Sequence, residues 1–234
     1  MRSENRQTST GIRVPAPPIG AAVCTPTSSL LVRRLGLAEY GPSYAAMRQF
    51  TTSRQEDTPD ELWILQHPPV YTAGLACRPE HLPRASNIPL ERIDRGGQIT
   101  YHGPGQVVLY TLLDLTRRKL RIRALVSLLE QAVINTLARH GTLAQRAAGA
   151  PGVYVDGAKV AALGLRVRSS GCYHGLALNV DMDLAPFHAI DPCGYPGLAV
   201  TQTRDLGIDA SADELGDEVA AELANLLERH ELRR

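Results

Sequence analysis

Apolar positions recur at helical spacing in two long segments, and both segments carry signals for a helix end. In residues 120–140 the apolar side chains fall at intervals of three and four residues: Ile122, Leu125, Val126, Leu129, Val133 and Leu137. This spacing places them on one face of a helix, and Gly141 stands where a glycine commonly follows a helix. A last helix is expected from Ser211, because Glu214 three residues later completes a capping box.

Shorter apolar runs between these segments predict strands. Strands are expected at 61–66, 106–113, 153–155, 159–167 and 175–180. His67-Pro68-Pro69 ends the first, because proline cannot donate a hydrogen bond to a sheet. Asp156-Gly157 is a two-residue hairpin signal that joins the third and fourth. A helical pattern covers residues 37–50, and a loop is expected at 77–92. Hairpins mixed with long helices favour an α/β (α+β) fold, with a mixed sheet flanked by helices in a single domain.

Composition narrows the class of protein further. The 234 residues include 25 basic and 24 acidic side chains, so no charge excess indicates nucleic-acid binding, and no apolar segment could span a membrane. Residues 1–28 are rich in Ser, Thr and Pro and are expected to be a disordered extension of a domain at 29–234. Without a secretory signal, a cytoplasmic location and reduced cysteines are expected. The cysteines are Cys24, Cys77, Cys172 and Cys193.

A run of basic residues at 117–123 precedes the longest expected helix. Most runs of this kind are the solvated start of a helix. The alternative is a docking patch for an acidic partner, since a local basic cluster attracts acidic surfaces.

The segment at residues 95–106 has the highest density of glycine in the chain, in the order R-G-G-Q-I-T-Y-H-G-P-G-Q. Glycine permits positive φ and lets the backbone approach a ligand closely. A tight turn between two strands is the plain structural interpretation. A substrate-binding loop is the functional one, because binding residues are often placed on loops held by a rigid scaffold.

Two single residues suggest chemistry. Lys159 stands alone among apolar residues, either as a surface lysine with a buried stem or as an ammonium held beside an apolar pocket. Cys193 lies between proline and glycine in an expected turn, where its sulfur could be exposed. Cys172 is the alternative nucleophile. Cys172 and His174, two residues apart, could also be ligands of a metal ion. No second pair occurs at structural-zinc spacing, so no metal is expected.

The segment at residues 95–106 closely resembles the signature of the octanoyl-[acyl-carrier-protein]:protein octanoyltransferases, the lipoate-protein ligase B family. Four further blocks agree in the same order: residues 66–72, 159–166, 173–180 and 191–195. The resemblance spans about residues 30–205. One departure is Gln66, which stands where the family usually has an acid.

The resemblance implies the fold of biotin and lipoate protein ligases and an acyl transfer without cofactor. An octanoyl group would pass from octanoyl-acyl carrier protein to Cys193 and then to a lysine of a lipoyl domain, with Lys159 lowering the pKa of the thiol and moving protons. The acceptors implied are the E2 subunits of 2-oxoacid dehydrogenases and the glycine cleavage H protein, and the enzyme is expected to be a monomer. Substrate-binding positions carried over are Arg95, Gly96, Gly97, Gln98, Ile99, Thr100, Tyr101, His102, Ala162, Leu163, Gly164, Gly175, Leu176 and Ala177.

Two alternatives stay open on the sequence. The first is an ATP-dependent lipoate or biotin ligase of the same fold, which would make an acyl-adenylate and need no nucleophilic cysteine. The chain has neither a phosphate loop ending in Gly-Lys-Ser/Thr nor a G-x-G-x-x-G before a helix. The second is a non-catalytic protein that only binds acyl groups.

Overall fold

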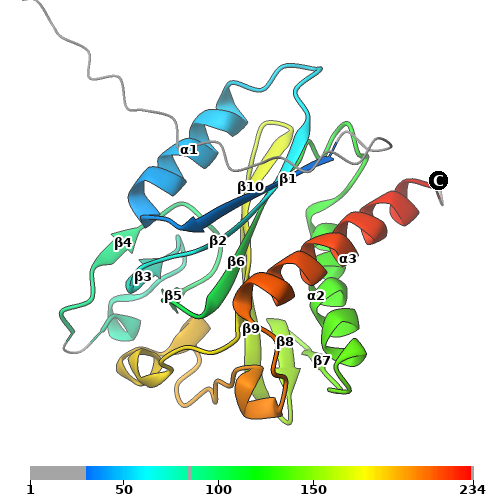
Figure 1. Ribbon diagram of the computed structural model, residues 1–234. Coiled ribbons are helices and arrows are strands. Elements are labelled where there is room, and N and C mark those ends of the chain that lie inside the picture. The colour runs from blue at the N-terminus through cyan, green and yellow to red at the C-terminus, as the bar shows by residue number, and fades with distance from the viewer. Residues whose placement is uncertain (1–29, 84–85, 233–234) are drawn as a thin grey trace, which may run out of the picture.

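A seven-stranded mixed sheet forms the centre of the structure, which is a computed structural model that describes residues 30–83 and 86–232 (Figure 1). The strand order is β1-β2-β6-β10-β9-β8-β7. The strands are β1 (Leu30–Leu37), β2 (Asp60–Gln66), β6 (Gln106–Leu112), β7 (Gln145–Ala147), β8 (Ala150–Val155), β9 (Ala158–Arg168) and β10 (Gly171–Asn179). β1 pairs with β2 in parallel, and all other neighbours in this sheet are antiparallel.

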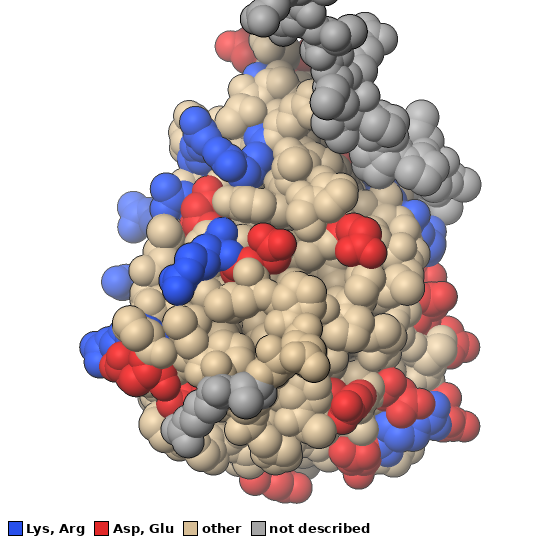
Figure 2. All heavy atoms as spheres, turned by 90° about the vertical axis from the view of Figure 1, so that its left-hand side faces the viewer, with Lys and Arg blue, Asp and Glu red and all other residues tan. Residues whose placement is uncertain are grey.

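A second sheet, of three strands in the order β4-β3-β5, carries part of the glycine-rich segment. Its strands are β3 (Val70–Ala73), β4 (Leu90–Arg92) and β5 (Ile99–His102). Figure 1 shows it beside the end of the large sheet that lies beneath α1 (Tyr40–Thr52). The face of the molecule that carries these elements is shown in Figure 2, where acidic and basic side chains are interspersed around a broad uncharged area.

Helices cover both faces of the large sheet. α2 (Ile122–Arg139) and α3 (Ala212–Leu232) pack on one face, and α1 lies on the other (Figure 1). β6 shows how one strand serves both layers, because successive side chains point to opposite faces. Leu109 packs in the cluster under α2 and α3, whereas Val108 and Tyr110 pack with Met47 of α1. A strand buried on both faces is mostly apolar, and β6 is buried throughout with only Gln106 and Thr111 as polar exceptions apart from Tyr110.

The structure confirms the mixed sheet flanked by helices and most of the elements expected from the pattern. The expected helix at 120–140 is α2, and the expected hairpin is β8 and β9. The capping box is also present, since the backbone N–H of Ser211 donates to Glu214 at 2.8 Å and that of Glu214 to the Ser211 hydroxyl at 3.3 Å. The expectation for residues 1–28 lies outside the described residues.

The structure also contains β5 and β7, for which no strand was expected, and four further elements differ in type or bounds. Residues 30–37 form the edge strand β1, which no alternating pattern marks because Arg33 and Arg34 interrupt it. β10 begins at Gly171, four residues before the predicted strand, and the expected loop at 77–92 contains β4. The helix expected over 37–50 begins only at Tyr40. Each difference depends on pairing with a segment distant in sequence, which local spacing does not show.

The basic run at 117–123 divides into a structural part and an exposed part. Arg117 and Arg118 both donate to the fully buried carboxylate of Asp60, which also accepts from Arg54. A buried carboxylate needs such partners. Docking of an acidic partner would therefore rest on Arg121 and Arg123, which are exposed at the start of α2.

None of the helices formed by residues 30–83 and 86–232 is long and apolar enough to cross a membrane. The cytoplasmic location and the monomeric state stay predictions.

Candidate active site

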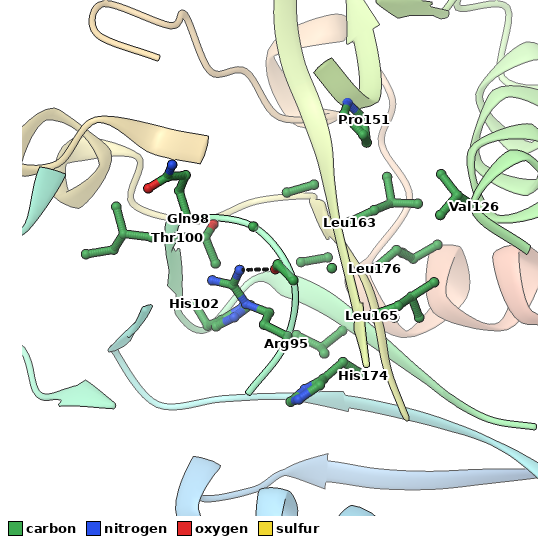
Figure 3. A pocket seen from close by; sticks show the side chains of 18 of the residues that line it. Arg95, Gln98, Thr100, His102, Val126, Pro151, Leu163, Leu165, His174 and Leu176 are labelled. Carbon is green, nitrogen blue, oxygen red and sulfur yellow. Dashed lines mark hydrogen bonds between the residues drawn. The ribbon is translucent and has the colours of Figure 1, made fainter. Parts of the chain in front are cut away.

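A pocket of about 290 Å³ runs along β9 and β10 beneath the glycine-rich loop (Figure 3). Nearly all predicted binding residues line it. They are Arg95, Gly96, Gly97, Gln98, Ile99, Thr100, His102, Ala162, Leu163, Gly164, Gly175, Leu176 and Ala177, together with Lys159. Residues 95–102 are therefore brought together with residues 159–177 by the pairing of β9 with β10 and by the loop that crosses them.

Tyr101 is the predicted binding residue that does not line the pocket. Because side chains alternate along β5, Tyr101 points away from its pocket-lining neighbours Thr100 and His102. Its ring packs instead against Tyr71 and Phe187, with ring centroids 5.6 and 5.5 Å away. The role of Tyr101 is to hold the three-stranded sheet against the segment after β10.

Small side chains hollow out the pocket. Gly164 pairs directly with Gly175 across β9 and β10, and Ala162 pairs with Ala177. Directly opposite residues share one face of a sheet, so these four leave space where larger residues would fill it. At Gly164 a Cβ atom would lie 2.9 Å from Cδ of Arg95, so the arginine fits there only against glycine.

Arg95 is built into the wall of the pocket. Its guanidinium donates to the carbonyl of Thr72 at 2.6 Å, to the Thr72 hydroxyl at 3.1 Å and to the carbonyl of Gly96 at 3.0 Å. The side chain is only 8% exposed. These bonds fix the loop between β4 and β5, and the backbone N–H of Gly96 attaches it to β9 through a 2.9 Å bond to the carbonyl of Leu165.

Lys159 lies at the open end of the pocket, near the exposed residues Pro151 and Tyr195. It is 3% exposed. Its backbone is bonded to the segment after Cys193. The N–H of Lys159 donates to the carbonyl of Ala199 at 2.8 Å, and the carbonyl of Lys159 accepts from the N–H of Thr201 at 3.0 Å. Its Nζ donates to the carbonyl of Pro151 at 3.1 Å. A lysine at a strand edge is thus turned inward, as the pocket interpretation predicted.

Cys193 lies in a short 3-10 turn, Pro192–Gly194, that packs against β5. The residues that follow Cys193 lie at the pocket. A Cβ on Gly194 would meet the side chain of Gln98 at 2.8 Å, and Tyr195 lines the pocket mouth. The backbone of Cys193 is therefore carried to the end of the pocket where Lys159 lies.

Cys172 is a poor competitor for the role of nucleophile. Its side chain is fully buried in the core under α2, and its Sγ lies 3.4 Å from the carbonyl of Thr111. Burial raises the pKa of the Cys172 thiol to about 12. A thiol that stays protonated and inaccessible is inert.

Aromatic and imidazole side chains form the other, closed end of the pocket: Tyr40, His102, Tyr110 and His174. All four are at most 7% exposed. His174 is paired with Leu165, six residues along β9 from Lys159, so the two ends are about 20 Å apart along the strand. Figure 3 shows Pro151 and His174 at opposite ends of the pocket.

The histidines at the closed end are held in their neutral form. Burial lowers the pKa of His102 to about 3, with a further contribution from His67, whose own pKa burial lowers to about 4. Nδ1 of His67 donates to the carbonyl of Ala38 at 2.6 Å, which leaves Nε2 to accept from the Tyr110 hydroxyl at 2.7 Å. Nδ1 of His102 donates to the Gln106 side chain at 2.7 Å.

A carboxylate borders this end. Asp94 accepts from the Tyr173 hydroxyl and lies 3.5 Å from Nε2 of His174. Burial works to raise the pKa of Asp94, but hydrogen bonds from His174, Tyr173 and Tyr44 outweigh it and hold that pKa well below its usual value. The pKa of His174 is lowered by burial.

Several pocket residues were not predicted: Tyr40, Val108, Tyr110, Val126, Ala150, Pro151, Leu165, His174 and Tyr195. Figure 3 shows Leu163 and Leu165 directed toward Val126 of α2, so the pocket reaches past the edge of β9. Among these, the sequence pointed to His174 as a pocket residue, because it directly precedes the predicted binding residue Gly175. Within residues 30–83 and 86–232, no cluster of His, Cys, Asp or Glu could hold a metal ion.

Comparison with known proteins agrees with this geometry. The chain is 60% identical to an octanoyltransferase of Aromatoleum aromaticum, over 86% of this chain and 87% of that protein, and 61% identical to one of Azoarcus sp., over 88% and 90%. The expected resemblance and the expected acyltransferase class are confirmed by these relatives.

Solved structures confirm the fold. A bi-partite lipoate protein ligase of Thermoplasma acidophilum has a TM-score of 0.65 at 18% identity, over 86% of this chain and 84% of that one. The biotin protein ligase of Aquifex aeolicus has a TM-score of 0.53 at 12% identity, over 85% and 70%. Residues 39–224 match the lipoyl protein ligase A/B catalytic domain. The chain belongs to the lipoyl protein ligase A/B catalytic domain family.

Proposed function

We propose that this protein transfers an octanoyl group from octanoyl-acyl carrier protein to a lysine of lipoyl domains through a thioester on Cys193. The observation that carries the proposal is the pocket, with Lys159 and the turn of Cys193 at its open end and aromatic and neutral imidazole side chains at its closed end. The names of the relatives support octanoyl as the acyl group. The E2 subunits of 2-oxoacid dehydrogenases and the glycine cleavage H protein are the proposed acceptors.

In the first step, the Cys193 thiolate attacks the carbonyl carbon of the donor thioester. A carbon–sulfur bond to Cys193 forms, the bond to the carrier thiol breaks, and the carrier thiolate takes up a proton from the Lys159 ammonium, which is left as the neutral amine. A cysteine thiol with an ordinary pKa is mostly protonated at neutral pH, and a nearby ammonium favours the thiolate. Lys159 is proposed to supply that ammonium.

In the second step, the lysine amine of the lipoyl domain attacks the Cys193 thioester. A carbon–nitrogen bond forms, Cys193 leaves as the thiolate, and the amine loses a proton to Lys159 or to a neighbouring group. Splitting the transfer in two replaces one difficult step with two easier ones. Since an amide is more stable than a thioester, the reaction requires no ATP.

Each tetrahedral intermediate needs hydrogen-bond donors near its oxyanion. The backbone N–H of Gly96 is committed to the carbonyl of Leu165, and Gly164 is paired with Gly175 in the sheet. Neither amide is therefore proposed as an oxyanion donor. The side chain of Gln98 borders the turn of Cys193, so the backbone N–H groups of Gly97 and Gln98 are proposed instead.

The closed end of the pocket is proposed to limit the length of the acyl chain. Each buried CH₂ group contributes about 0.8 kcal/mol, so an open-ended apolar channel would favour longer chains. Tyr40 and Tyr110 close the channel with rings that are at most 5% exposed. The neutral histidines beside them are compatible with an uncharged acyl end.

Mass spectrometry of the intact protein tests the acyl-enzyme directly. Mixing the protein with octanoyl-acyl carrier protein is expected to add one octanoyl group, and Cys193→Ala is expected to abolish the adduct. Cys172→Ala is the matched control, and its adduct should persist. Normal transfer by Cys193→Ala would refute the nucleophile assignment.

Nucleotide dependence separates the proposal from a ligase of the same fold. The octanoyl-loaded protein, freed of carrier, should modify a lipoyl domain in buffer that contains no ATP. Strict dependence on ATP would indicate an adenylating ligase. Loading without any transfer would indicate a protein that only binds acyl groups.

A further inference from the structure

The peptide group between Pro151 and Gly152 makes a hydrogen bond at each of its two ends. Its carbonyl accepts from Nζ of Lys159 at 3.1 Å. Its N–H donates to Oε1 of Glu130 at 3.1 Å. A trans peptide group is planar, and its C=O and N–H point in opposite directions. The carboxylate of Glu130 and the ammonium of Lys159 therefore lie at opposite edges of one rigid, planar group.

Gly152 allows this arrangement for two reasons. Its φ of +144° lies in a region that residues with a side chain rarely adopt. A Cβ at this position would also lie 2.8 Å from the carbonyl oxygen of Ala161, 2.9 Å from Cε of Lys159 and 3.2 Å from Nζ. The space that the lysine side chain occupies is thus the space that glycine leaves empty.

The carboxylate of Glu130 is itself held in place, so it can fix the orientation of the Pro151–Gly152 peptide. It lies on α2 and is only 6% exposed. Its second oxygen accepts from Nε of Arg146 at 2.9 Å, and Arg146 is tied to α2 again through the carbonyl of Ser127 at 2.9 Å. A buried carboxylate is stable when it is paired and hydrogen-bonded in this way.

We propose that Glu130 is a positioning residue for Lys159, acting through the Pro151–Gly152 peptide, and that Gly152 is the residue that makes room for the ammonium. Hydrogen bonds in series polarise one another, so a carboxylate on the N–H strengthens the carbonyl as an acceptor. The lysine is thereby directed toward the pocket mouth. The consequence for catalysis rests on the proposed role of Lys159, whereas the positioning itself does not.

The lysine content of the chain allows the positioning to be measured without any assay of activity. The chain contains two lysines, Lys119 and Lys159. Protein labelled with ¹³C-lysine should therefore give two Cε signals, and Lys159→Arg assigns them. In the wild type the two Hε protons of Lys159 are expected to differ in shift, because the side chain is fixed. In Glu130→Leu the shift difference between the two Hε protons of Lys159 should become much smaller, because the side chain is no longer fixed.

A matched control separates positioning from plain stability. Glu222 of α3 accepts from Asn135 at 2.7 Å and Arg139 at 2.9 Å, so it ties α3 to α2 much as Glu130 ties α2 to β8. Glu222→Leu should lower the melting temperature without moving the Lys159 signal. Glu130→Gln, which keeps one oxygen for the N–H of Gly152, should restore much of the wild-type spectrum.

The rate of acyl-enzyme formation supplies the second measurement. Glu130→Leu should slow it about tenfold or more at saturating carrier, with KM changed less than about twofold, because a displaced catalytic group lowers kcat. A shifted Lys159 signal with an unchanged rate would uphold the positioning and refute the proposed catalytic role of Lys159. An unshifted signal in Glu130→Leu, as in Glu222→Leu, would overturn the positioning.

Gly152→Ala gives an independent check through stability. The added methyl group should lower the melting temperature, and the loss should be smaller in a Lys159→Ala background, where Cε and Nζ are absent. Equal losses in both backgrounds would show that Gly152 does not make room for the lysine. Such a double-mutant comparison isolates the pairwise contact.

Discussion

Both ends of the pocket have buried basic side chains, but their surroundings favour opposite charge states. At the open end, Nζ of Lys159 donates to a carbonyl and lies 5.2 Å from the centre of the Tyr154 ring, both of which favour an ammonium. At the closed end, His67 and His102 are buried without a carboxylate in hydrogen-bonding contact, and burial lowers the pKa of each.

The difference shows that burial alone does not decide the charge of a basic group. Hydrogen-bond partners contribute as well, because a donor-only ammonium needs acceptors whereas a neutral imidazole is satisfied by one donor and one acceptor. Each end of the pocket provides the partners that its own side chain requires. On the proposed mechanism, the open end presents an ammonium near the Cys193 turn, and the closed end presents aromatic rings and neutral imidazoles to the acyl chain.

Removing the charge at the open end should have the largest effect. Lys159→Ala is expected to slow acyl-enzyme formation by about 10²-fold or more, the range in which acid–base groups contribute. Lys159→Arg should also be slow, since arginine keeps the charge but does not readily give up its proton. Stopped-flow mixing with octanoyl-carrier protein measures both rates.

The other lysine provides the control for that experiment. Lys119 has a φ of +49°, so Lys119→Arg changes the side chain without the backbone demand that glycine or alanine would alter. It should acylate at the wild-type rate. A fast Lys159→Arg variant would reduce the role of Lys159 to electrostatics, and a fast Lys159→Ala variant would remove it.

Filling the space between the two ends should change which acyl chain is accepted. Ala177 faces the pocket opposite Ala162, and Ala177→Leu would add three carbons to this narrow part. Excluding two CH₂ groups costs about 1.6 kcal/mol, so preference should move about tenfold from octanoyl toward hexanoyl. Competition between hexanoyl- and octanoyl-carrier protein, read by mass spectrometry, measures the ratio. Equal losses for both chains would mean that Ala177→Leu only disturbs the fold.

Sequence patterns predicted the elements that are determined by residues close together in the chain. α2 follows from its apolar spacing, and the start of α3 follows from the box of Ser211 and Glu214. The neutral histidines could not be predicted in that way, because their state depends on carbonyls and hydroxyls far along the chain. The surroundings of Lys159 are also distant in sequence, since Ala199 and Thr201 of the segment after Cys193 bond its backbone and Glu130 of α2 bonds the N–H of Gly152.

The site residues themselves were recognised through a family resemblance. The pattern alone left Lys159 and Cys193 as weak hypotheses. The pattern also does not show toward which face of a strand each side chain points when a turn precedes the strand. Tyr101 is the example. In the sequence it stands between two pocket residues, yet alternation along β5 turns its ring to the other side.

Acid should weaken the fold through the closed end. The pKa of His67 is lowered to about 4 in the folded protein, whereas an unfolded histidine titrates near pH 6.5. Between these values the unfolded chain binds more protons, so stability falls as pH falls from about 6.5 to about 4, by about 1.4 kcal/mol per pH unit for each such histidine. Urea unfolding of the wild type and His67→Gln at several pH values should show a shallower slope for the variant. Identical slopes would mean that His67 is protonated in the fold.

The smallest effect is expected at Cys172, a buried thiol that does not line the pocket. Cys172→Ala removes a sulfur that is fully buried beside the carbonyl of Thr111 and whose pKa is raised to about 12. Octanoyl loading should stay at the wild-type level, and the free energy of unfolding should fall by about 1 kcal/mol, as for other small losses in a core. Iodoacetamide should label Cys193 far faster than Cys172 in the native protein, because only an accessible thiolate reacts. Loss of the octanoyl adduct in Cys172→Ala would require the core under α2 to open during the reaction, and would move the chemistry away from the end of the pocket where Lys159 lies.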